Sequence, residues 1–223
     1  MQGMNGKYRA LFQVVIGLLL VGNLACASAI ANSAAVPPPP PAAPLAIAVV
    51  GDQNTAGINN RVVWPTLMAD RTGWSVSNYA LPEAGFAADG MGGHAFSYQV
   101  DRAQASHPQV ILLVTGTADA SVPEAEAVSI GAAEALNKVI RGGEQAAVVG
   151  PIWYETPVPD SIWRANDAIQ KAAERAGVPF FNAVDPPLLT RKLMHPDLSG
   201  PSDEGQSVIA NSIAAWLRKA VVR

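Results

Sequence analysis

The chain has 223 residues, of which 49% are hydrophobic and only 15% are charged, and this composition excludes a disordered acidic or basic protein. Its 15 Lys and Arg residues against 18 Asp and Glu residues give a formal net charge of −3, and with no basic cluster the sequence predicts no nucleic-acid binding. One Cys and three His cannot form a zinc ribbon, a Cys-rich redox centre or a disulfide framework, so we expect neither a metal nor a cofactor.

Residues 1–31 have the organisation of a secretory signal peptide. Lys7 and Arg9 are followed by an apolar run and then by small residues in an A-x-A pattern, which is the order of the n-region, the h-region and the cleavage site of such a signal. We therefore expect cleavage after Ala29 or Ala31 and a protein that is secreted or associated with the cell envelope.

Two other fates of this segment stay open. Residues 10–31 are nearly long enough to span a bilayer uncleaved, although Gly and Asn residues dilute their apolar character. Cys26 is a candidate for lipidation, but Asn23 stands where a lipobox usually has Leu. We favour simple cleavage, which leaves no stable membrane span. The sequence does not predict the oligomeric state.

Residues 32–44 are rich in proline and are expected to be a linker. Pro37–Pro41 and Pro44 favour an extended polyproline II conformation that buries nothing. Such a spacer would hold the domain that follows, residues 45–223, away from the envelope. A recognition ligand for a proline-binding module is the alternative.

Strands and helices alternate in the domain from residue 45 onward. Short apolar runs, most of them continuous as in buried parallel strands, predict strands at Leu45–Val50, Trp74–Tyr79, Val110–Val114, Ala146–Val149 and Phe180–Val184.

Apolar residues at helical spacing predict helices between these strands and at the end of the chain. One helix lies between His94 and His107. The next is expected to begin at a capping box, Ser121–Glu124, and to bury Ile140 in its apolar stripe. Asp160 and Ser202 are expected to cap the last two helices.

This alternation predicts an α/β fold with a five-stranded parallel sheet and right-handed crossovers, covered by helices on both faces. We expect a flavodoxin-like three-layer α/β/α sandwich with strand order 2-1-3-4-5. In such a sheet the functional crevice lies beyond the carboxyl ends of the strands, so the loops at that edge carry the informative motifs.

Four short blocks in these loops resemble, in order, those of the SGNH hydrolases, also called the GDSL esterase/lipase family. The blocks are Gly51–Thr55, Asn78–Gly85, Gly116–Asp119 and Asp197–Gly205. The resemblance covers nearly all of residues 45–223. It implies the same sandwich fold and, for a complete catalytic set, hydrolysis of ester bonds.

In that family a Ser of the first block attacks the ester carbonyl, a His of the last block removes its proton, and an Asp three residues earlier orients the His. The resemblance places Gln53 at the Ser position and Gly200 at the His position, while Asp197 matches the orienting Asp. It also places Ala118 where an Asn side chain would stabilise the oxyanion. The oxyanion glycine matches Gly85 with a small gap.

The residues at these positions cannot run the family mechanism. The nitrogen lone pair of the Gln53 amide is delocalised, and Gly200 offers no base. Loss of a catalytic Ser or His costs on the order of 10⁶ in turnover, and each lost oxyanion donor costs about 10² to 10³. Without a gap in the alignment of the second block, the oxyanion glycine would match Glu83 in place of Gly85. This ambiguity matters less than the loss of the Ser, the His and the Asn.

A relocated catalytic pair is the alternative. His195 could enter the crevice through a shifted loop and act as the base, or it could be an ordinary surface histidine. Its carboxylate partner would be Asp185 or Asp197, and the hydroxyls near it in the loops are Thr55, Ser121 and Ser199.

Other residues of the same loops are expected to support or bind rather than react. Asp52 and Asp119 follow strands and are expected to be structural, accepting hydrogen bonds from loop amides. Aromatic rings after the fourth strand could stack on a sugar or line an acyl groove, or they could pack against the Pro-rich loop that follows. The expected ligand-binding residues are Gln53, His94, Trp153 and Tyr154.

Three functional hypotheses follow. The first is an exported, catalytically inactive protein whose crevice binds an envelope glycan, an acyl ligand or a partner protein. The second is an active esterase or acyl-hydrolase with relocated residues. The third is a structural domain that docks a partner and has a filled crevice. The first is preferred on the chemistry of the matched residues.

Overall fold

The computed structural model describes residues 43–90, 92–93 and 95–221. The predicted signal peptide, most of the predicted linker, Cys26 and His94 lie outside the described residues, so the predictions made for them stay predictions. None of the helices in the described ranges is both long enough and apolar enough to cross a membrane.

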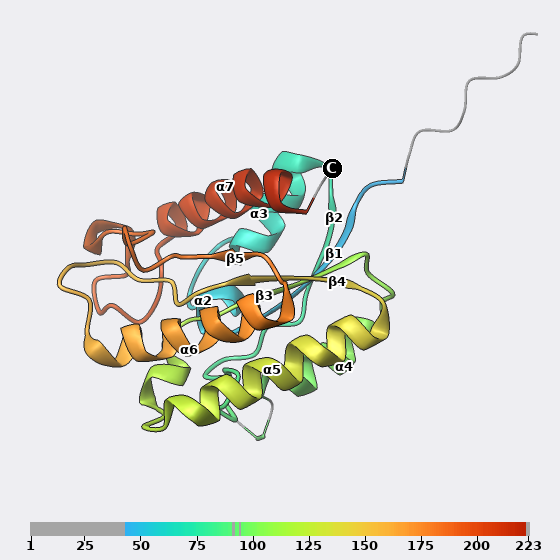
Figure 1. Ribbon diagram of the computed structural model, residues 1–223. Coiled ribbons are helices and arrows are strands. Elements are labelled where there is room, and N and C mark those ends of the chain that lie inside the picture. Colours follow the sequence, from blue (N-terminus) through green and yellow to red (C-terminus); the bar gives the residue numbers. More distant parts are fainter. Residues whose placement is uncertain (1–42, 91, 94, 222–223) are drawn as a thin grey trace, which may run out of the picture. The chain divides into compact units, whose positions relative to one another are not determined.

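Five strands form one all-parallel sheet in the order β2-β1-β3-β4-β5 (Figure 1). This confirms the predicted strand order and fold class. The strands are β1 (Ala46–Gly51), β2 (Ser75–Asn78), β3 (Val110–Val114), β4 (Gln145–Val149) and β5 (Phe180–Phe181).

Strand β5 is shorter than the apolar run predicts. It pairs with β4 only through Phe180 and Phe181. The side-chain oxygen of Asn182 accepts hydrogen bonds from the amides of Val184 (2.9 Å) and Asp185 (3.2 Å). This side chain turns the chain away from the sheet, because Asn competes locally with strand pairing.

The helices follow the predicted alternation. They are α2 (Gln53–Ala56), α3 (Trp64–Thr72), α4 (Phe96–Gln104), α5 (Ala125–Gly142), α6 (Asp160–Ala176) and α7 (Asp203–Ala220), with short 3₁₀ helices η1 (Ala118–Ser121) and η2 (Arg191–Leu193). The short elements α2, η1 and η2 were not predicted, because three or four residues are too few to show a helical period.

Each face of the sheet has its own apolar core. Helices α4, α5 and α6 cover one face, and α3 and α7 cover the other (Figure 1). Along β3, Ile111 and Leu113 pack toward the first group of helices, whereas Leu112 and Val114 pack toward the second. Because successive side chains of a strand point to opposite faces, an entirely apolar strand is what a sheet covered on both sides requires.

The predicted helix caps are only partly confirmed. Ser202 caps α7, and its hydroxyl oxygen accepts a hydrogen bond from the amide of Gly205 (3.2 Å). The capping box at Ser121 was wrong. The Ser121 hydroxyl donates to the carbonyl of Ala118 (2.6 Å) within η1, and α5 begins after Glu124 with no side-chain cap.

Two further details of the helices were also wrong. Asp160 is the first residue of α6 rather than its cap, a position that Pro159 takes. Ile140, in the last turn of α5, is 45% exposed and does not join the buried stripe of that helix.

Candidate functional site

The carboxyl ends of the central strands meet at one edge of the sheet. Gly51 at the end of β1 pairs with Val114 of β3, and Val114 pairs with Val149 of β4. The loops that follow these strands therefore start side by side and bring together the motif residues.

Asp52 anchors the first of these loops. Its carboxylate accepts the amide hydrogen of Asn54 (3.0 Å) and so caps the short helix α2. It lies against Gly116, where a Cβ atom would overlap it. Complete burial raises the pKa of Asp52 to about 7. These are the contacts of a residue that fixes the backbone below the site.

Asp119 holds the loop after β2 in a similar way. Its carboxylate accepts hydrogen bonds from three consecutive amides, those of Phe86 (2.8 Å), Ala87 (2.9 Å) and Ala88 (3.1 Å). Gly85 lies directly against this carboxylate, so a side chain there would clash with it. The acid of the third block thereby ties the second block to η1.

Gln53 and Glu83 face one another above these two acids. The side-chain oxygen of Gln53 accepts a hydrogen bond from the backbone amide of Glu83 (3.0 Å). Glu83 has φ = 62°, a left-handed conformation that costs little only for glycine. The amide of Gly85 instead donates to the carbonyl of Ala88 (2.9 Å). The amide that faces position 53 is therefore that of Glu83, the ungapped match, and not that of Gly85.

An open depression of about 430 Å³ lies over this pair. Its lining residues are Gln53, Glu83, Gly90, Thr117, Ala118 and Ser121. Sequence reasoning placed Gln53 and Ala118 here and missed Glu83 and Thr117. The signal for Glu83 was the ungapped alignment of the second block, whereas Thr117 carried no signal of its own.

A second depression of about 450 Å³ continues the first along the edge of the sheet. It shares Thr117 and Ser121 with the first and extends to the loop after β4 and the start of α6. Its other lining residues are Ala120, Trp153, Tyr154, Pro159, Ser161, Ile162 and Leu198. Together the two depressions form one open crevice, which we call the crevice below.

The two aromatic residues after β4 contribute unequally to the crevice. Trp153 is only 9% exposed and packs in a small apolar cluster with Ile162. Tyr154 is partly exposed, lies 4.6 Å from Trp153 between ring centroids, and has the Arg191 guanidinium 5.8 Å from its own centroid. The Trp153 ring is thus mostly buried beneath the surface of the crevice, and Tyr154 is the more accessible of the two rings.

Position 200 supplies no base, although a Cβ atom would fit there. Gly200 is buried, and a Cβ atom would make ordinary van der Waals contacts, 3.4 Å from Ile58 and 3.8 Å from the side-chain oxygen of Asn54. The carboxylate of Asp197 accepts hydrogen bonds from the amide (3.0 Å) and the hydroxyl (2.7 Å) of Ser199. These bonds lower the pKa of Asp197 and direct its carboxylate to the exposed tip of its own loop.

Among the described residues, no hydrogen bond joins His195 to the candidate hydroxyls or carboxylates. His195 lies close enough to Asp197 for its charge to favour the ionised carboxylate, but the Ser199 hydroxyl donates to Asp197 (2.7 Å) and not to His195. His195 is half-buried, its Nε2 atom lies 3.5 Å from the side-chain nitrogen of Asn60, and it lines neither depression. The Ser121 hydroxyl already donates to a carbonyl of η1. The Thr55 hydroxyl is buried and accepts a hydrogen bond from the Trp64 indole (3.3 Å).

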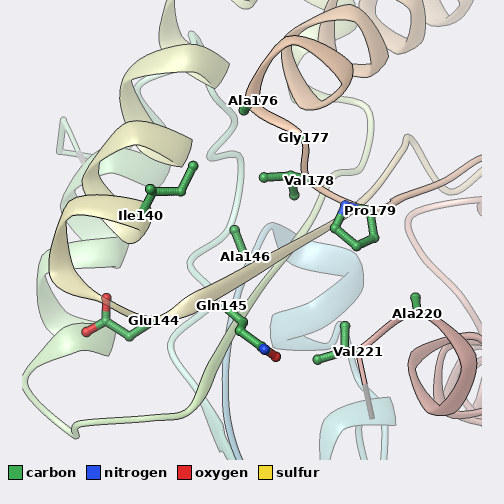
Figure 2. Close-up of a pocket in the computed structure, with 10 residues that line it drawn as sticks. All are labelled: Ile140, Glu144, Gln145, Ala146, Ala176, Gly177, Val178, Pro179, Ala220 and Val221. Carbon is green, nitrogen blue, oxygen red and sulfur yellow. The ribbon is translucent and has the colours of Figure 1, made fainter. Parts of the chain in front are cut away.

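The remaining large depression lies at the opposite edge of the sheet. It has a volume of about 560 Å³ and forms where α5, α6 and α7 end, beside the start of β4 (Figure 2). No predicted site residue lies there. Within the described ranges, no three His, Cys, Asp or Glu side chains come together as a metal site would require.

Solved structures with the same fold include an esterase and a lipase/acylhydrolase. The psychrotrophic esterase EstA from Pseudoalteromonas sp. is 15% identical, with a TM-score of 0.61, covering 78% of this chain and 96% of its own. TesA is 16% identical, with a TM-score of 0.65, covering 78% and 99%. The lipase/acylhydrolase from Enterococcus faecalis is 15% identical, with a TM-score of 0.61, covering 78% and 96%.

The sequence itself carries the family assignment. No curated protein sequence matches the chain. The family model described as GDSL-like Lipase/Acylhydrolase matches residues 49–208, which is more than half of the chain and contains all four blocks. The chain therefore belongs to the GDSL-like lipase/acylhydrolase family.

Proposed function

We propose that this protein is an exported, non-hydrolytic member of its family that binds a glycan of the cell envelope in the crevice. The observation that carries the proposal is the hydrogen bond between the Gln53 side chain and the Glu83 amide. A protein carbonyl group already occupies the amide donor that faces position 53.

This bond opposes ester hydrolysis in two ways. Stabilising an oxyanion requires free donors aimed at the position where its charge develops, and the Glu83 amide is already satisfied by Gln53. The chemistry also requires a nucleophile with an adjacent base. Gln53 supplies no nucleophile, and Gly200 is packed against Ile58 with no side chain that could take a proton.

The lining of the first depression favours a sugar over an acyl chain. A fatty acyl group needs a predominantly apolar groove, and the first depression offers hydroxyl groups at Thr117 and Ser121 beside the Gln53 carboxamide. The second depression has a mostly apolar lining and offers the partly exposed ring of Tyr154. Hydroxyl groups with an aromatic platform are suited to the polar edges and apolar faces of a pyranose ring.

The amino terminus supports an envelope location for this ligand. Residues 1–31 have the n-region, apolar run and small residues of an export signal. Cleavage would leave 13 basic residues against 18 acidic ones, a net charge of −5. Attraction of the whole domain to anionic lipid head groups would then be weak, so contact with the envelope would run through the crevice.

Hydrolysis is tested with short p-nitrophenyl esters. We expect the purified full chain to release no p-nitrophenol above a heat-denatured control, because it has neither nucleophile nor base at the matched positions. A turnover of about 1 s⁻¹ or more, within the ordinary enzyme range, would overturn the non-hydrolytic proposal. The variant His195→Ala would then identify whether a relocated base is responsible.

Binding is tested by chemical-shift mapping with soluble oligosaccharides released from envelope material. We expect affinities in the micromolar to millimolar range, equivalent to about 4–8 kcal/mol. Shifts should cluster on Gln53, Glu83, Ala118 and Tyr154. The depression at the opposite edge, which includes Ala146, serves as the internal control. Shifts confined to that edge, or no shifts at all, would exclude the crevice as the glycan site.

A further inference from the structure

Glu83 is distinguished from the rest of the crevice by its charge. Among the described residues that line the two depressions, Glu83 carries the only formally charged side chain, and the others are apolar, hydroxyl-bearing or amide-bearing. The side chain is exposed. No described Lys, Arg or His forms an ion pair with it.

The backbone holds this carboxylate in a fixed place. The Glu83 amide donates to the Gln53 side chain (3.0 Å), and the residue keeps a left-handed conformation, with φ = 62°. Such a conformation is uncommon for any residue but glycine, and its strain persists only where the surroundings impose it. The adjoining segment is tied down by Asp119 through three amides. Glu83 therefore projects from a rigid base.

The charges around the crevice reinforce that of Glu83. In a parallel α/β sheet the helices run back against the strands, so their amino-terminal turns lie at the crevice edge. Acidic side chains occupy the first turns of α5, α6 and α7, at Glu126, Asp160, Asp203 and Glu204. Three described cations offset part of this charge: Arg61 lies 3.9 Å from Asp203, Arg164 donates to the Ala120 carbonyl, and Arg191 lies over the Tyr154 ring and pairs with Glu155. The acidic side chains named here still outnumber these cations, so the mouth of the crevice attracts cations and repels anions.

From this geometry we infer that the crevice selects amine-bearing glycans and that the Glu83 carboxylate binds the ammonium group of an amino sugar. The inference rests on the proposed glycan binding and names the ligand class within it. The ammonium group donates hydrogen bonds to the carboxylate. The Ser121 and Thr117 hydroxyls line the same depression and would form hydrogen bonds with the hydroxyl groups of the sugar ring. N-acetylation removes the charge, and a uronic acid reverses it.

The test compares three soluble tetrasaccharides by isothermal titration calorimetry against the full chain. These are β-1,4-linked glucosamine, its N-acetylated form and galacturonate, at a pH where the amines are protonated. Because exposed ion pairs contribute modestly, we expect glucosamine tetramer to bind about two- to fivefold more tightly than the acetylated form. Galacturonate should bind most weakly.

The variant Glu83→Gln isolates the carboxylate. It removes one negative charge without a change of size, and we expect it to abolish the preference for the amine, measured as the ratio of the dissociation constants of the two tetramers. The matched control is Glu124→Gln, which removes the same charge from an exposed residue that caps α5 and lines neither depression. The control should keep the preference.

Reversing the charge at position 83 tests the same preference independently. Glu83→Lys should shift the preference toward galacturonate. If Glu83→Gln and Glu83→Lys both keep the wild-type preference, the inference is overturned while glycan binding stands. If none of the three tetrasaccharides nor any envelope oligosaccharide binds, the proposed function itself fails, and the inference fails with it.

Discussion

The side chain at position 53 both removes the nucleophile and occupies a donor. A serine hydroxyl there would need a base to ionise it, and it could not reach as far toward Glu83 as the longer Gln53 side chain does. Replacing Gln53 by Ser would therefore restore the hydroxyl and free the Glu83 amide, but it would not supply the base that ionises the hydroxyl.

We expect Gln53→Ser alone to show no esterase activity, because the hydroxyl would stay protonated with no base at Gly200. The triple variant Gln53→Ser, Ala118→Asn, Gly200→His restores the nucleophile, one oxyanion donor and the base. We expect measurable p-nitrophenyl ester hydrolysis from the triple variant only. Robust activity of the single variant would mean that a base lies elsewhere in the crevice.

Asp52 gives a pH dependence to stability. Burial raises its pKa from 3.8 to about 7, so between these values the native state holds a proton that the unfolded chain releases. The free energy of unfolding supplied by this residue is therefore greatest below pH 3.8 and falls as the pH rises to about 7.

We expect Asp52→Asn to remove that fall, which can reach about 1.4 kcal/mol per pH unit. Urea denaturation of wild type and variant from pH 4 to 8 measures it. Asp197→Asn is the control, since the pKa of Asp197 is lowered and not raised. This variant should keep the fall in the free energy of unfolding that Asp52 causes between pH 4 and 7. Parallel curves for wild type and Asp52→Asn would contradict the assignment.

The sequence predicted many of the site residues, but not which residue of the second block faces position 53. The blocks placed Gln53 and Ala118 in one depression, because each follows a strand that ends at the same edge. They could not show that Glu83 rather than Gly85 faces position 53. That depends on a left-handed backbone at a glutamate, which residue preferences disfavour.

At the scale of elements, apolar runs were sufficient for the strands and spacing for the long helices. Helix starts were less predictable, because a cap depends on hydrogen bonds that compete locally. Ser121 and Ser202 stand in similar sequence contexts, but only the Ser202 hydroxyl accepts an amide hydrogen of its helix.

This difference is measurable. We expect Ser202→Ala to lower the free energy of unfolding by about 1 kcal/mol, the usual effect of losing an N-cap. Ser121→Ala is the matched control at a residue that caps no helix, and it should change stability by less than about 0.5 kcal/mol. Equal losses in chemical denaturation would mean that the Ser202 contact does not stabilise α7.

At the scale of the whole molecule, charge is sorted along the strand direction. Basic side chains lie in the last turns of the helices, at Arg71, Arg102, Arg141, Arg175 and Arg218, and acidic ones lie in the first turns of α5, α6 and α7. Each arrangement complements the helix dipole. Together they leave the crevice end with an excess of acidic side chains, which Arg61, Arg164 and Arg191 only partly offset.

We expect this sorting to affect the rate of ligand association. The association rate of a glucosamine oligomer should fall as sodium chloride rises from 50 to 500 mM, because salt screens the field at the crevice. The rate for the acetylated oligomer should change little. Stopped-flow measurement of both with the same chain provides the comparison, and equal salt dependence would count against electrostatic steering.

The two outer strands of the sheet also affect how readily the protein aggregates at high concentration. Strand β2 is four residues long and mostly exposed, with Ser75, Ser77 and Asn78 at its edge, and β5 is only two residues long. Unpaired strand edges are templates for aggregation when they are long, flat and apolar. Strand β2 presents mostly polar side chains, and β5, although it consists of Phe180 and Phe181, has few free backbone groups because it is so short. Edge-to-edge growth into fibrils therefore has little to start from.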